Sequence, residues 1–102
     1  MDLQQAKTQL TTIRDNLPPD YSISSARKLM SAFENYKQIS QGLGRDLPRQ
    51  KLGIRSEFDD IQQRIKSAII GTPKKESESS FSHAKKLIME DINKIIAVAS
   101  QA

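Results

Sequence analysis

The sequence predicts a small all-α protein, an up-down-up-down helical bundle of about four antiparallel helices. The alternative is three helices with a swapped or separately docked fourth. Three observations favour this class. Apolar residues recur at steps of three and four along several segments, Gly and Pro separate these segments, and no alternating apolar and polar segment is long enough to predict a sheet. The expected helices cover residues 3–17, 24–42, 47–70 with a break near Gly53, and 81–99.

Length and composition predict a single domain over residues 1–102. Apolar residues make up 36% and charged residues 27% of the chain, which is enough apolar material for one core under a polar surface. Cys is absent, which excludes disulfides and Cys-based zinc sites. The core must therefore form by apolar packing alone.

The first helix is predicted from apolar residues that share one stripe. These are Leu3, Ala6, Leu10, Ile13 and Leu17. Pro18-Pro19 follows directly, and a proline disfavours helical geometry at the residue before it. We therefore expect this helix to end at Leu17.

The second helix follows a turn rich in serine. Ser22, Ser24 and Ser25 each offer an N-cap side chain, and Gly42 and Gly44 are expected to end the helix. Its apolar side consists of Ala26, Leu29, Met30, Phe33 and Tyr36.

The third helix has the most regular apolar face. This face consists of Ile54, Phe58, Ile61, Ile65, Ala68 and Ile69. Pro48 is tolerated in a first turn, and Gly53 precedes the regular part, so we expect a short turn near 47–52 and then a break.

The segment 72–80 is predicted to be a flexible internal linker. Gly71-Thr72-Pro73 is a strong helix stop, and Lys74 to Ser80 contains no apolar residue that would join a core. The last helix is then expected to start near Ser80 or Ser82.

Apolar residues of the last helix extend around more of its circumference than contact with the rest of the bundle requires. One arc consists of Ala84, Leu87, Ile88, Ile95 and Val98. A second stripe, formed by Met89, Ile92 and Ile96, is predicted to contact a second subunit or a partner helix. The alternative is that this helix is central and buried on most sides by the other three.

Asp91 interrupts the first arc of this helix. A buried carboxylate needs a partner, for which an Arg or Lys from another helix is the first expectation. The alternative is a rotated helix that leaves Asp91 at a wet margin.

The net charge of +4 is a mild excess of basic residues with both signs well mixed. The densest basic stretch consists of Arg45, Arg49, Lys51 and Arg55. These side chains are candidates for contacts with phosphates, although acidic neighbours dilute their field and no aromatic residue is present to stack a base. A solvated loop is the alternative interpretation.

Residue types that carry catalysis or bind metals are sparse. His83 is the only histidine, no Cys is available as a nucleophile, and the acidic pairs are adjacent residues that point about 100° apart on a helix. We therefore expect no enzyme activity, no metal, no cofactor and no small-molecule substrate.

These observations together predict a non-enzymatic protein-protein interaction or adaptor module that presents a helical surface to a protein partner or to a second copy of itself. The alternative is a small accessory nucleic-acid-binding protein that contacts the phosphate backbone through the basic loop. No secretory signal and no membrane span is recognisable, so a cytoplasmic protein without a membrane partner is expected.

Overall fold

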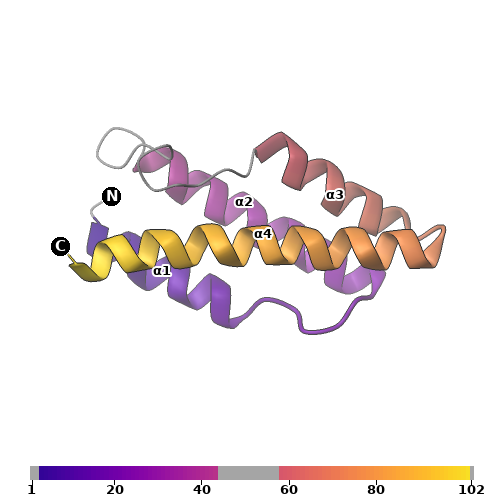
Figure 1. Cartoon of the computed structure of the whole chain (residues 1–102), viewed down its shortest axis with the longest axis horizontal. Coiled ribbons are helices and arrows are strands. Elements are labelled where there is room, and N and C mark those ends of the chain that lie inside the picture. Colours follow the sequence, from indigo (N-terminus) through magenta and orange to yellow (C-terminus); the bar gives the residue numbers. More distant parts are fainter. Residues whose placement is uncertain (1–2, 44–57, 102) are drawn as a thin grey trace.

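The computed structural model describes residues 3–43 and 58–101, which form a bundle of α-helices (Figure 1). Within these ranges the helices are α1 (Leu3–Asp15), α2 (Ile23–Gly42), α3 (Phe58–Ile70) and α4 (Lys74–Gln101). They run alternately up and down, so the start of α1 and the end of α4 lie at the same end of the bundle. The predicted all-α class is confirmed. The expected turn at 47–52 and the break near Gly53 lie outside the described residues.

Helix α1 ends at Asp15, earlier than the predicted Leu17. The amide of Leu17 donates to the carbonyl oxygen of Arg14, three residues earlier, at 3.3 Å, whereas an α-helical bond spans four residues. The turn before Pro18 is therefore no longer α-helical, as expected where a proline disfavours helical geometry at the residue before it. Leu17 itself still belongs to the buried core.

Helix α2 begins at a predicted serine cap, and its C-cap is Leu43, not a glycine. The Ser22 side chain accepts a hydrogen bond from the amide of Ser25 at 2.9 Å, which satisfies one free amide of the first turn. At the other end the helix stops at Gly42, and the buried Leu43 closes it by donating its amide to the carbonyl oxygen of Ile39 at 3.2 Å.

Helices α3 and α4 are joined by the tight turn Gly71-Thr72-Pro73. Gly71 has a φ of 78°, in the left-handed region that favours glycine after a helix. A Cβ on Gly71 would lie 2.9 Å from Cδ1 of Ile23, so the first residue of α2 packs against this turn. The turn thus needs glycine for its backbone and for its close neighbour.

The predicted linker 72–80 is wrong from Lys74 onward, where α4 begins. The Ser77 side chain is 2% exposed, and its hydroxyl donates to the carbonyl oxygen of Ser67 in α3 at 3.1 Å. Ser77 lies four positions before the buried Phe81, so the contact stripe of α4 extends into the polar segment. The prediction failed because it required an apolar side chain at each buried position, whereas the buried position 77 is a serine.

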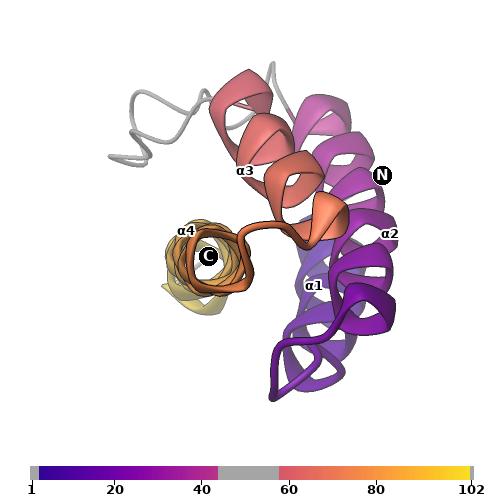
Figure 2. The same cartoon turned by 90° about the vertical axis from the view of Figure 1, so that its right-hand side faces the viewer.

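Helix α4, with 28 residues, is the longest, while α1 and α3 have 13 each. It lies along one side of the other three helices, which form an arc (Figure 2). Its neighbours are α3, reached by the Ser77 hydroxyl, α2, whose Tyr36 hydroxyl donates to Asp91, and α1, where the Gln4 side chain donates to the carbonyl oxygen of Ala99 at 3.2 Å. Every helix contributes to the core. Its largest apolar side chains include Leu10, Leu29, Phe33, Ile61, Ile65, Phe81, Ile88 and Ile92.

Candidate interaction surface

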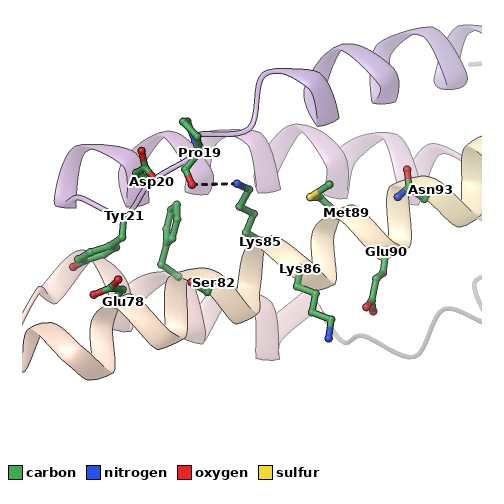
Figure 3. Close-up of a pocket in the computed structure, with 11 residues that line it drawn as sticks. Pro19, Asp20, Tyr21, Glu78, Ser82, Lys85, Lys86, Met89, Glu90 and Asn93 are labelled. Atoms are coloured by element: carbon green, nitrogen blue, oxygen red, sulfur yellow. Dashed lines mark hydrogen bonds between the residues drawn. The ribbon is translucent and has the colours of Figure 1, made fainter.

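A groove with a volume of about 520 Å³ runs along α4 (Figure 3). One wall is the irregular segment between α1 and α2, and the other is the part of α4 from Glu78 to Asn93. The residues that line it are Pro19, Asp20, Tyr21, Glu78, Phe81, Ser82, Lys85, Lys86, Met89, Glu90 and Asn93. At 1.5 Å per helical residue, this stretch of α4 is roughly 22 Å long, enough for about four turns of a bound helix.

The irregular wall exists because α1 is short. Pro18-Pro19 prevents the helix from continuing, so the chain covers the first half of α4 with an extended segment. Tyr21 anchors this segment: its hydroxyl donates to the carbonyl oxygen of Ala68 at 2.7 Å, and its ring meets that of Phe81 edge-on at 5.5 Å between centroids. The wall is thus fixed to both α3 and α4.

The α4 wall combines a methionine with charged side chains. Met89 is partly buried and packs against the core, while the Lys85 ammonium donates to the carbonyl oxygen of Pro19 at 3.5 Å across the groove. Lys86 and Glu90 point away from Pro19 (Figure 3). A partly apolar floor with a charged rim is typical of a protein-binding surface.

The three residues of the predicted interface stripe have different environments. Ile92 is fully buried inside the bundle, so its predicted contact with a partner is wrong. Helix α1 packs against α4 near this residue, where the Arg14 side chain donates a hydrogen bond to the Asn93 side chain at 2.9 Å. Met89 and Ile96 are partly buried against the core and keep some exposure. Their contact with a partner stays a prediction.

A second groove, of about 410 Å³, lies between α1 and α2. It is lined by Thr8, Gln9, Thr12, Ile13, Asn35, Gln38, Ile39 and Gly42. All of its polar lining residues are uncharged, in contrast to the charged rim of the α4 groove. It offers hydrogen bonds but no ion pair to a partner.

Asp91 is 1% exposed, so the prediction of a wet margin for it is wrong. The Tyr36 hydroxyl of α2 donates to Asp91 Oδ2 at 2.7 Å, a short bond of the kind that a carboxylate accepts. The sequence predicts a partner for a buried Asp91, with an Arg or Lys as the first expectation, and does not point to a tyrosine. Both Tyr36 and Asp91 are buried and lie at helical spacing among apolar residues. This spacing was the feature of the sequence that could have predicted a contact between them.

The basic residues proposed as phosphate contacts cannot be placed in the same way. Arg45, Arg49, Lys51 and Arg55 lie outside the described residues, so their role stays a prediction. His83 is exposed and lies well inside α4.

Across residues 3–43 and 58–101, no group of three or more His, Cys, Asp or Glu side chains lies close enough together to hold a metal ion. None of the four helices found there is both long and apolar enough to cross a membrane.

The α4 groove is therefore the candidate surface that the described residues form most completely, since it joins two walls, an apolar floor and a charged rim. Comparison of the chain with models of protein families, with curated proteins and with solved structures finds no match.

Proposed function

We propose that this chain is a non-enzymatic protein-protein interaction module that binds a protein segment along the α4 groove. The observation that carries the proposal is the groove itself, with partly buried Met89 and Tyr21 beside the charged side chains of α4. Such a surface supplies apolar contact area in its centre and charges at its edge that select the partner.

The shape of the groove favours an elongated partner. Its α4 wall runs from Glu78 to Asn93, and Arg14 of α1 reaches this wall at Asn93, its last residue. A helix or an extended strand would continue the track of α1 over this part of α4. Helix-in-groove binding of this kind depends on a few apolar anchors, and Met89 adapts easily to different anchors.

Photo-crosslinking in the source cells tests this proposal. A benzophenone amino acid in place of Asp20, which is exposed on the irregular wall, is expected to capture a discrete protein. The same group in place of Ser31, which is exposed on α2 outside the groove, is the position control.

A pair of matched variants assigns the captured product to the groove. Met89→Glu is expected to reduce crosslinking at position 20, because it puts a charge on the apolar floor. Met30→Glu changes a methionine that is also partly buried but lies outside the groove, and should leave the product unchanged. Equal crosslinking from positions 20 and 31, or equal loss in both variants, would contradict the proposal.

A further inference from the structure

The exposed surface of α4 contains a regular row of charges beside the groove. Residues four apart follow one another along the helix, and all five are exposed. The row reads Lys74, Glu78, Ser82, Lys86 and Glu90, and four of its members also line the groove. Rows at this spacing form the ridges by which helices pack against one another.

This row is complementary to itself when reversed. Around a two-fold axis at Ser82, an antiparallel second copy places its Lys86 opposite Glu78 and its Glu90 opposite Lys74. Each pair then occurs twice, as it must in an interface that uses the same patch on both copies. Among the described residues, none of these four charged side chains forms an ion pair within its own chain. All four are therefore available to a neighbour.

We propose that the partner of the α4 groove is a second copy of this chain, packed antiparallel through α4 with Ser82 on the two-fold axis. The inference rests on the proposed function, because the row borders the groove. Ser82 and the adjacent Ser79 are small, which allows the two helices to approach closely.

The charges also disfavour the neighbouring registers. A shift of the axis toward residue 80 places Lys74 opposite the second copy's Lys86, and a shift toward residue 84 places Glu78 opposite the second copy's Glu90. Like charges face each other in both cases. The row thus favours one register by attraction and excludes the two adjacent ones by repulsion.

Sedimentation over a dilution series, at low and high salt, tests the charge pattern. The wild-type chain is expected to dimerise, more weakly at high salt because the ion pairs are exposed. Lys86→Glu turns two attractive contacts into two repulsive ones and should raise the dimer dissociation constant roughly tenfold or more. The double variant Glu78→Lys with Lys86→Glu restores opposite charges and should restore the dimer. Lys66→Glu makes the same change in net charge at an exposed position of α3 and is the control.

Disulfide trapping tests the position of the axis. Because the chain has no Cys, a single Ser82→Cys variant carries one thiol, which on the axis lies opposite its own copy. Mild oxidation should trap a dimer with Ser82→Cys and not with Ser31→Cys on α2.

A chain that stays monomeric at all concentrations overturns this inference. So does a dimer that ignores Lys86→Glu and gives no preferential trapping at position 82. In either case, crosslinking of another protein from position 20 would leave the proposed function standing. Its absence would refute that function separately.

Discussion

The two flanks of α4 are packed in different ways. On the α3 flank, α4 approaches closely enough for the buried Ser77 hydroxyl to reach a backbone carbonyl of α3. On the α1 flank, α1 ends at Asp15, the irregular segment after it continues along α4, and a groove of about 520 Å³ remains. The difference shows how a bundle keeps its core closed with one neighbour and leaves a surface for binding beside the other.

The largest expected effect tests burial on the α1 flank. Ile92→Glu places a charge in the core and should lower the free energy of unfolding by about 3–5 kcal/mol, enough to unfold a marginal domain. Met89→Glu, one helical turn away in the open groove, should cost less than about 1 kcal/mol. Circular dichroism with urea titration measures both. Equal losses would mean that the groove is closed in solution.

The next effect tests the closeness of the α3 flank. Ser77→Leu adds methylene groups where the helices meet and should cost about 1–3 kcal/mol in the free energy of unfolding. Ser79→Leu, exposed on the same helix, is the matched control and should stay within about 0.5 kcal/mol of wild type. If both variants have the same urea midpoint, α3 and α4 are not tightly packed around Ser77.

A third prediction concerns the turn that holds α3 and α4 together. Gly71→Ala forces a side chain into a left-handed backbone and against Ile23, and should cost about 1–2 kcal/mol. Gly42→Ala, in helix α2 with no atom within 4 Å of the new Cβ, should instead stabilise by about 0.5–1 kcal/mol. Thermal unfolding of the two variants should therefore shift in opposite directions, and shifts of the same sign would contradict this account of Gly71.

The smallest effect concerns the irregular wall of the groove. Tyr21→Phe removes the hydrogen bond to the Ala68 carbonyl and keeps the ring contact with Phe81, so it should cost about 0.5–1.5 kcal/mol. Urea titration gives this change in stability. If Tyr21→Phe lowers the free energy of unfolding as much as Ser77→Leu does, the α1 flank and the α3 flank of α4 contribute similarly to stability.

The fold was predictable from the sequence because the spacing of apolar residues and the helix ends depend mainly on residues close together in the chain. Apolar periodicity predicted the class and the core stripes, and Ser22 and Gly42 predicted the ends of α2. The start of α4 was missed because Ser77 is polar, and only its tertiary contact with α3 reveals that it belongs to the core stripe.

The candidate surface was less predictable, since it depends on which helix covers which face. The periodicity predicts an apolar stripe of Met89, Ile92 and Ile96, but Ile92 is buried inside the bundle whereas Met89 lines the groove. The groove itself arises from the early end of α1 and the path of the segment after it. Neither of these is encoded in the periodicity of α4.

The contact between α1 and α4 also sets an order of assembly. The Gln4 side chain bonds to Ala99, and the two residues are 95 positions apart, whereas α3 and α4 are joined by the tight turn at Gly71. Closing a long loop costs more chain entropy than closing a short one, so contacts between nearby segments form first. The α3-α4 hairpin is therefore expected to form early and α1 to dock last. In native-state hydrogen exchange, the amides of α1 should open before those of α3, as the least stable unit of the bundle.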